Sequence, residues 1–190
     1  MTRNRRAMRL LGAPLALATS LGMAVALTAG PAQASSTSKS DPAGDHEMSS
    51  SANLDLAKVS MKTKGKQKIQ ITFGLHNDVT ADELVFPGGL GVDFQIAKKS
   101  VRAVHLFSRD GVLESNICTY DTRKEQFPPP TKCRTLPFTQ VDGKTFRVEL
   151  KRKHVKKGAK VLKWKASAFA FTSGAVDPLG SATKPFTWRL

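Results

Sequence analysis

Apolar residues recur at every second position through most of the chain after residue 54. Ile69, Ile71, Phe73 and Leu75, for example, alternate with polar or small residues. A period of two places the apolar side chains on one face of an extended strand, whereas a helix repeats every 3.6 residues. This alternation predicts an all-β fold, and no internal repeat is evident.

Turn residues separate the alternating segments. Lys64-Gly65-Lys66 joins the first two segments into a hairpin, and Asp110-Gly111 and Asp142-Gly143 are dipeptides typical of tight hairpin turns. One helical turn is expected near Thr80–Leu84. The expected strands cover residues 57–62, 69–75, 90–96, 101–107, 112–120, 134–141, 146–150, 161–172 and 186–190. Eight or nine short antiparallel strands predict a single jelly-roll-like β-sandwich.

The first 34 residues have the composition of a signal peptide. A Leu/Ala-rich run over 10–29 is followed by Ala32-Gln33-Ala34, a small-x-small cleavage site, and preceded by arginines at 3, 5, 6 and 9. A membrane anchor is the alternative, but Gly, Pro, Ser and Thr residues dilute the run. Arg5-Arg6 also fits a twin-arginine signal, although Arg9 stands where that signal prefers an apolar residue, which favours the general secretory route. The chain is therefore expected to be exported, with no transmembrane segment after cleavage.

Residues 35–40 are rich in Ser and Thr and are expected to form a flexible linker before a single domain over 41–190. Removal of residues 1–34, which carry four arginines and no carboxylate, leaves 156 residues with a net charge of +11 out of +15. This length suits one domain with a sizeable core. The excess of positive charge favours polyanions as partners without specifying which.

Cys118 and Cys133 are the two cysteines of the chain. An even count in an exported domain predicts one disulfide, which would close a loop containing Phe127-Pro128-Pro129-Pro130. The spacing is far from Cys-x-x-Cys and no His lies nearby, so a redox or zinc pair is not expected. The bond is interpreted as a structural disulfide that closes an irregular loop between two strands.

Carboxylates gather at the entrance of the domain, in Asp41-Pro42-Ala43-Gly44-Asp45 and at Asp55. Asp41 and Asp45 flank a bend, Asp55 begins the first strand, and Asp93 lies on the polar face of a later strand. Calcium prefers six to eight oxygen ligands, which such carboxylates and loop carbonyls supply. Asx-turns, in which Asp41 and Asp45 accept nearby backbone N–H groups, explain the same residues without a metal. Both interpretations remain open at this stage.

The densest cationic run lies near the carboxyl end. It comprises Lys151, Arg152, Lys153, Lys156, Lys157, Lys160, Lys163 and Lys165. Binding of an anionic polymer there would be electrostatic and sensitive to salt. A solvated face that aids solubility is the alternative. Nucleic acid is not an expected partner, because the protein is exported and exposed aromatic residues do not interleave with the lysines.

Enzymatic motifs are incomplete. His46-Glu47 begins like the zinc-protease motif His-Glu-x-x-His, but Ser50 stands in place of the second His, and no Gly-x-Ser-x-Gly elbow occurs. Asp93 and Glu114 are the carboxylates that a glycoside hydrolase would pair. The chain is not expected to be an enzyme, and a hydrolase is the least favoured hypothesis.

Four short motifs together carry a resemblance to a known group. They are Asp-Pro-x-Gly-Asp at 41–45, Asp-Leu-x-x-Val at 55–59, Val-Asp at 92–93 and Trp-x-Ala at 164–166. The chain resembles secreted actinobacterial β-sandwich proteins similar to the family 9 carbohydrate-binding module-like and DOMON-type folds. The resemblance implies a jelly-roll-like sandwich with calcium near the first strand. Carbohydrate modules of this kind stack sugars on exposed aromatic residues, whereas Trp164, Trp188 and Tyr120 are the only large amphipathic aromatic residues here.

Together these features predict a secreted or cell-wall-associated module without enzymatic activity. Calcium would stabilise it, and its ligand would be a saccharide or a cell-wall polymer. The alternative is a cationic protein that binds polyanions through the surface of residues 151–165. The oligomeric state does not follow from the sequence.

Overall fold

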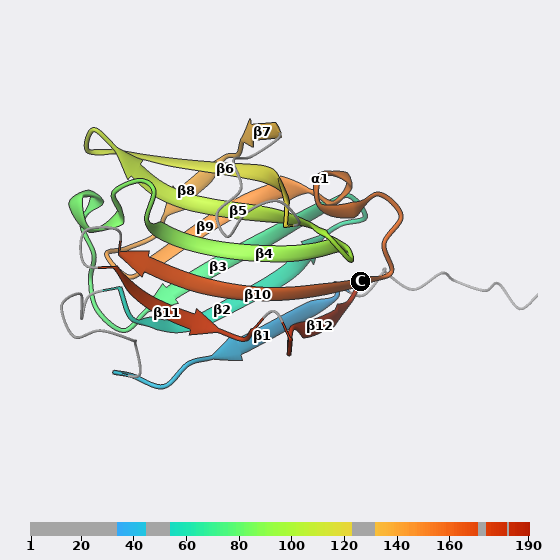
Figure 1. The fold of residues 1–190 in the computed structure, drawn as a ribbon, viewed down its shortest axis with the longest axis horizontal. Coiled ribbons are helices and arrows are strands. Elements are labelled where there is room, and N and C mark those ends of the chain that lie inside the picture. The colour runs from blue at the N-terminus through green and yellow to red at the C-terminus, as the bar shows by residue number, and fades with distance from the viewer. Residues whose placement is uncertain (1–33, 45–53, 123–131, 171–173, 182) are drawn as a thin grey trace, which may run out of the picture. The chain divides into compact units, whose positions relative to one another are not determined.

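Two antiparallel β-sheets form the protein (Figure 1). The computed structural model describes residues 34–44, 54–122, 132–170, 174–181 and 183–190. The first sheet has the order β1-β2-β3-β9-β8, with bounds β1 (Ser36–Ser40), β2 (Leu56–Lys64), β3 (Lys68–Leu75), β9 (Thr145–Lys151) and β8 (Phe138–Gln140). The second has the order β11-β10-β4-β5-β6-β7, with bounds β11 (Ala175–Leu179), β10 (Val161–Ala170), β4 (Gly89–Ala97), β5 (Ser100–Arg109), β6 (Val112–Asp121) and β7 (Lys132–Thr135). In addition, β12 (Phe186–Arg189) pairs with β10.

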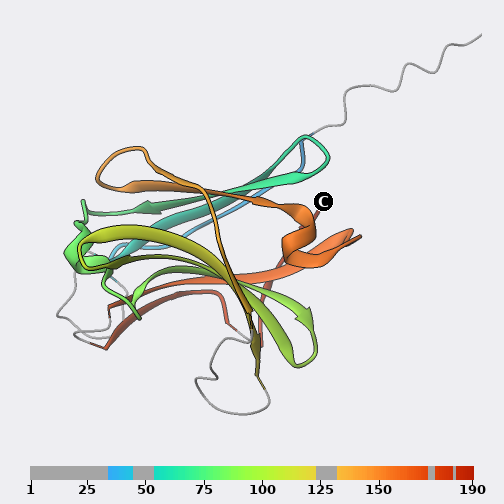
Figure 2. The ribbon, with the colours of Figure 1, turned by 90° about the horizontal axis from the view of Figure 1, so that it is seen from above.

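The sheets pack face to face around one core, as Figure 2 shows from above. In the first sheet the inward positions are those predicted by the alternation, and Ile69, Ile71 and Phe73 of β3 are fully buried. Val92 and Phe94 of β4 and the aromatic rings of β10 and β12 fill the same space from the second sheet. The predicted all-β sandwich is confirmed, with twelve strands in the described part of the chain instead of eight or nine.

The predicted hairpin turns are confirmed. Gly65 lies between β2 and β3 with a φ of 62°, and Asp110 and Gly111 between β5 and β6 have φ values of 51° and 74°. Positive φ at both central residues is the requirement of the tight turn that Asp-Gly favours. Asp142-Gly143 lies between β8 and β9, which pair antiparallel. The predicted helical turn is a 3₁₀ helix over Ala81–Leu84.

Cys118 and Cys133 are bonded as expected. They face each other across the antiparallel β6 and β7 pair, with their Cα atoms 4.1 Å apart. The bond therefore fixes the short edge strand β7 to β6.

The structure departs from the expected secondary structure in four places. Residues 35–40 are not a linker, because Ser36–Ser40 form the edge strand β1, which pairs with β2 from Ser36↔Lys62 to Ser40↔Lys58. The single strand expected over 134–141 is two strands, β7 in the second sheet and β8 in the first. The cationic run includes the short helix α1 (Arg152–Lys156), which the alternation did not reveal, and β11 was missed.

No helix in the described part of the chain is long and apolar enough to cross a membrane.

Candidate functional site

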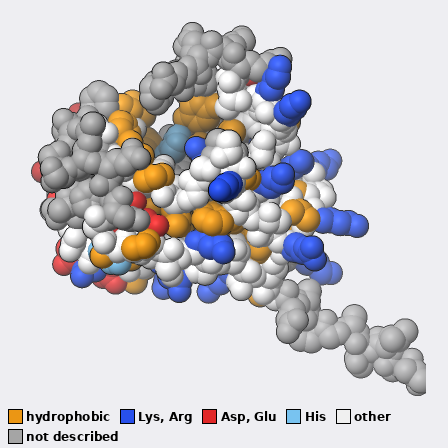
Figure 3. Space-filling view, turned by 60° about the horizontal axis from the view of Figure 1, so that its bottom comes forward, with side chains coloured by type: hydrophobic (Ala, Val, Ile, Leu, Met, Phe, Trp, Pro, Cys, Tyr) orange, Lys and Arg blue, Asp and Glu red, His pale blue; other side chains and the backbone are white. Residues whose placement is uncertain are grey.

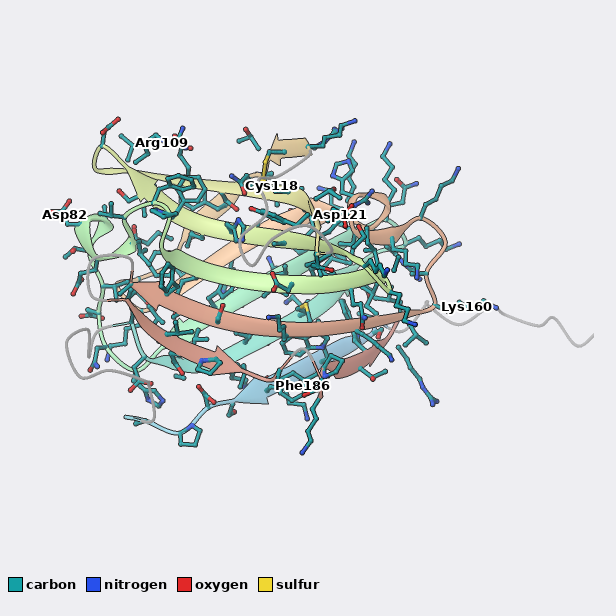
Figure 4. The ribbon with its side chains drawn as sticks, in the orientation of Figure 1. Asp82, Arg109, Cys118, Asp121, Lys160 and Phe186 are labelled. Atoms are coloured by element: carbon teal, nitrogen blue, oxygen red, sulfur yellow. A yellow bond between two sulfur atoms is a disulfide. The ribbon has the colours of Figure 1, made fainter. Side chains whose placement is uncertain are left out.

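Charge is segregated between the two ends of the sandwich. We call the end formed by the β2–β3 turn (64–68), the β4–β5 turn (97–100) and the β9–β10 connection (151–161) the cationic end. The opposite end, with the loop 76–88 and the turns 109–112 and 141–145, is the acidic end. Figure 4 shows Lys160 and Asp82 at these two ends, and Figure 3 shows basic side chains gathered on one side with carboxylates on the other. The fold thus concentrates positive charge that the sequence distributes over several segments.

A hollow of about 590 Å³ lies at the cationic end. We call it the lysine hollow, and its lining consists of Lys66, Gln67, Lys151, Arg152, Lys153, Lys157, Gly158, Ala159 and Lys160. Six of these side chains are basic and none is a carboxylate. The β2–β3 turn contributes one wall, and α1 with the loop after it contributes the rest.

Hydrogen bonds from Arg152 hold the walls of the lysine hollow together. Its backbone N donates to the carbonyl of Gln67 in the β2–β3 turn at 2.7 Å, and its Nη2 donates to the carbonyl of Ala159 at 2.6 Å. Val155 is fully buried and Ala159 is nearly so, which anchors the helix and the loop to the core. Gly158 allows the turn between them with a φ of 72°. The basic side chains therefore project from a fixed framework.

Two further hollows continue from the lysine hollow. One, lined in part by Arg102, Lys132 and Arg134, shares Lys153 with it. The other shares Lys151 with it. These three hollows give a continuous cationic surface, which draws on β5, β7 and the β2–β3 hairpin as well as on the run of residues 151–160. The sequence interpretation missed this contribution, although the lysines around the predicted turn at Gly65 were a signal for it.

Few carboxylates offset the positive charge of this surface. Of the residues that line the three hollows in the described part, Glu149 is the only carboxylate. It binds Lys64 at 2.6 Å and lies 3.8 Å from Lys68. Because of the hydrogen bond from Lys64, the pKa of Glu149 is lowered. Within the described residues, the five lysines of the lysine hollow form no ion pair.

Arg102 supports the helix that carries part of this surface. Its Nη1 donates to the carbonyls of His154 and, at 2.9 Å, of Val155, which are among the carbonyls that a short helix leaves without partners. Burial, followed by the positive charges of Arg134, Lys153, Lys151 and Arg102, lowers the pKa of His154.

Lys163 and Lys165, predicted to belong to the same surface, do not line the lysine hollow but a different one, which also includes Lys98 of the β4–β5 turn. They project from β10 into a hollow of about 250 Å³ on the second sheet, together with Asp93. Lys165 forms an ion pair with Asp93 at 3.4 Å. Lys156 is exposed on α1 but does not line the lysine hollow. The eight basic residues predicted from the sequence therefore divide, and Lys151, Arg152, Lys153, Lys157 and Lys160 line the lysine hollow together.

At the acidic end, two of the four predicted calcium ligands are close. The carboxylate of Asp55 is buried, with Oδ2 accepting the backbone N–H of Gly44 at 2.8 Å, and the Nε2 of His76 lies 3.2 Å from the carbonyl of Asp41. The backbone of Asp55 also accepts the N–H of His76. The bend after Asp41 therefore folds back onto the start of β2, while Asp45 lies outside the described residues.

A second buried carboxylate, Asp177 of β11, was not predicted. Its Oδ2 accepts the backbone N–H of Leu56, the residue after Asp55. Asp93 does not join this region. It lies on the face of β4 opposite to Val92 and Phe94, hence on the side of the second sheet that faces away from the core. Among the described residues, no three His, Cys, Asp or Glu side chains are grouped to hold a metal.

The carboxylates considered for hydrolysis are far apart. Asp93 aligns with Ala103 and Cys118, whereas Glu114 lies four residues farther along β6 and two strands away. Strand spacing and rise give a backbone separation of roughly 16 Å, compared with about 5 to 9.5 Å between the carboxyl groups of glycosidases. This pair therefore has the wrong geometry for glycoside hydrolysis.

Comparisons with protein-family models, with curated proteins and with solved structures find no match to this chain.

Proposed function

We propose that this protein is an exported, non-enzymatic module that binds an anionic polymer outside the cell through its cationic end. The observation that carries the proposal is the continuous cationic surface around the lysine hollow, in which Glu149 is the only lining carboxylate of the described residues. Unneutralised positive charge in a hollow attracts anions more strongly than isolated charges on a convex surface. The anionic polymers of a cell wall are the class of partner that an exported protein of this charge would meet.

The arrangement of the aromatic side chains favours this proposal over stacking of a saccharide. Trp164 and Trp188 are 1% and 2% exposed, so neither presents its face to a sugar. The Nε1 of Trp188 donates to the Oγ of Ser35 at 2.8 Å, which ties β12 to the residue before β1. Tyr120 lies against His105 with 5.9 Å between the ring centroids. The two tryptophans contribute to the fold, whereas the lysines remain accessible.

Export is supported by the N-terminal sequence and by the disulfide. The basic, apolar and small-x-small segments of residues 1–34 follow the order of a secretion signal. The bond between Cys118 and Cys133 persists in an oxidising compartment and is uncommon in the cytosol.

The test is binding of the purified protein to a fluorescent linear polyanion as a function of NaCl concentration. If the five lysines of the lysine hollow each release one counterion, the slope of log K against log [salt] is about −3.5, taking about −0.7 per contact as for single strands. Affinity then falls roughly 100-fold between 50 and 200 mM salt. The double variant Lys153→Gln/Lys160→Gln is expected to reduce the slope by about 1.4.

Lys58→Gln/Lys144→Gln is the matched control, because it removes the same charge from exposed lysines remote from the cationic end. The control is expected to bind like the wild type. If both double variants weaken binding equally, only net charge matters and the cationic end is not the site.

A second proposal concerns calcium at the acidic end, and the observation that favours it is Asp55. Its Oδ1 is buried and has no hydrogen-bond partner in the described part of the chain. A buried, unpaired carboxylate oxygen is costly, and a bound cation would offset that cost. Asp55, Asp41 and backbone carbonyls are the oxygen donors that would hold calcium, whose role would be to stabilise the fold.

Thermal unfolding with calcium or with chelator at fixed salt tests this second proposal. Calcium at a hundredfold excess over its Kd is expected to add about 2.7 kcal/mol to the free energy of unfolding. Asp55→Asn should abolish the gain, whereas Asp82→Asn, an exposed carboxylate at the same end, should preserve it. Absence of a gain at millimolar calcium would leave Asp41 and Asp45 as turn residues.

A further inference from the structure

We infer that the lysine hollow is a site for multiply charged phosphate groups, and that the polymer bound at the cationic end is a linear phosphate polymer. This inference rests on the proposed function and specifies the chemistry of its ligand. Three observations support it. Five ammonium groups line one hollow, the side chain of Arg152 is partly engaged by a backbone carbonyl, and the hollow shares lining residues with two neighbouring hollows.

Five lysines surround a common space. Lys66 comes from the β2–β3 turn, Lys151 and Lys153 from the start of α1, and Lys157 and Lys160 from the loop that follows. None has an ion-pair partner among the described residues. A volume of about 590 Å³ is within the range of small-molecule sites and holds several oxyanion groups. Neutralising these lysines requires a ligand with several negative charges in a short length, which adjacent phosphates provide.

The chemistry of the basic groups favours phosphate over carboxylate. Arg is the side chain that recognises a planar carboxylate through two parallel hydrogen bonds. Arg152 is the only arginine that lines the lysine hollow among the described residues. Its Nη2 donates to the carbonyl of Ala159, so part of its donor edge is occupied. The remaining cations are ammonium groups, which act as point charges with donors that rotate freely. They suit tetrahedral oxyanions, whose several oxygens are shared among lysines on different walls.

The path of the surface indicates a chain and not a single small anion. Lys153 lines both the lysine hollow and the hollow that contains Arg102, Lys132 and Arg134. His154 lines this second hollow and a third one, which also contains Lys151 and Lys68. A linear polymer that fills the lysine hollow can therefore extend past Lys153 toward β7 while each repeat contacts a cation.

Isothermal titration calorimetry with tripolyphosphate as the probe and citrate as the carboxylate reference tests the inference. The purified protein at 50 mM NaCl is expected to bind tripolyphosphate at least tenfold more tightly than citrate. Lys153→Gln/Lys160→Gln should weaken the binding of tripolyphosphate at least tenfold. Lys58→Gln/Lys144→Gln should change the affinity for tripolyphosphate less than twofold. Long-chain polyphosphate should bind more tightly than tripolyphosphate, because it reaches the neighbouring hollows.

Three outcomes would overturn the inference. In the first, polyglutamate binds as tightly as polyphosphate of equal charge, and citrate binds as tightly as tripolyphosphate. The site then does not select phosphate, although the proposed binding of polyanions stands. If no polyanion binds, the proposed function itself is wrong. If vesicles containing phosphatidylglycerol bind more tightly than polyphosphate, the phosphate is that of a lipid surface and not of a linear polymer.

Discussion

Replacement of Asp177 by alanine is expected to destabilise the sandwich by leaving a buried N–H without an acceptor. Asp177 lies opposite Ala168 in the β10–β11 ladder, so both side chains face the core. Its Oδ2 accepts the backbone N–H of Leu56, a residue with no exposed surface in the first sheet. The carboxylate therefore bonds the edge of the second sheet to the start of β2.

The expected loss follows from the asymmetry between making and breaking a buried hydrogen bond. A buried donor left without a partner costs about 1 to 3 kcal/mol. For a domain of this size each kcal/mol shifts the melting temperature by about 2 to 4 °C, so the variant should melt roughly 2 to 12 °C lower. Urea unfolding followed by tryptophan fluorescence measures the change, because Trp164 and Trp188 are both buried and respond to loss of the core. Chelator is included so that calcium does not contribute.

Asp177→Asn is the control, because the amide oxygen retains an acceptor for Leu56 in a side chain of the same size. Its free energy of unfolding should lie closer to that of the wild type than that of Asp177→Ala. The reasoning is refuted if the alanine variant is within about 0.5 kcal/mol of the wild type, the range of ordinary surface substitutions. It is also refuted if both variants lose the same stability, since the effect would then come from the charge and not from the bond to Leu56.

Two further predictions concern the second sheet. Cys118→Ala/Cys133→Ala should lower the free energy of unfolding by about 3 kcal/mol, as the chain-entropy model gives for a loop of this length, and a reductant should then no longer affect stability. The pKa of His105 is lowered, chiefly by burial and against the opposing influence of Asp93, so the unfolded chain binds more protons below its ordinary pKa of 6.5. Stability is therefore retained above pH 6.5 and lost as the pH falls below it, and His105→Asn should flatten this dependence in unfolding curves measured between pH 8 and about pH 5. An unchanged pH profile in that variant would contradict the prediction.

Much of the fold could be predicted from the sequence because its core follows a simple rule. Ile69, Ile71 and Phe73 are buried on one face of β3, as their spacing requires. Asp110-Gly111 forms a hairpin because both residues accept positive φ. These features depend on neighbours in the sequence, and alternation and turn chemistry describe such neighbours well.

The prediction of the fold was wrong where the alternation of apolar and polar residues carries no information. The β1 strand is an exposed edge made of Ser, Thr and Lys, and its pairing with β2 needs backbone groups alone. Leu136-Pro137 separates β7 from β8, and alternation cannot tell that the two strands belong to different sheets. In α1 only Val155 is buried, so this five-residue helix lacks the apolar stripe that would reveal it.

The prediction of the candidate site was also correct only in part. Lysines in the β9–β10 connection and lysines on the strand β10 project in different directions. Lys163 and Lys165 alternate with the buried Leu162 and Trp164 of β10, so they point away from the core onto the outer face of the second sheet, where Lys165 meets Asp93. Lys153 and Lys160 precede that strand and project from the end of the sandwich.

An end of a sandwich gathers connections from both sheets, whatever their distance in the sequence. Here the β2–β3 turn adds Lys66 to the lysines of the β9–β10 connection, and a linear count of charges misses that addition. A site predicted from one continuous run of basic residues therefore includes too many lysines where the run enters strand β10, and it omits basic residues that other connections supply. Positions in connections, and not the density of charge along the chain, determine which lysines can meet one ligand.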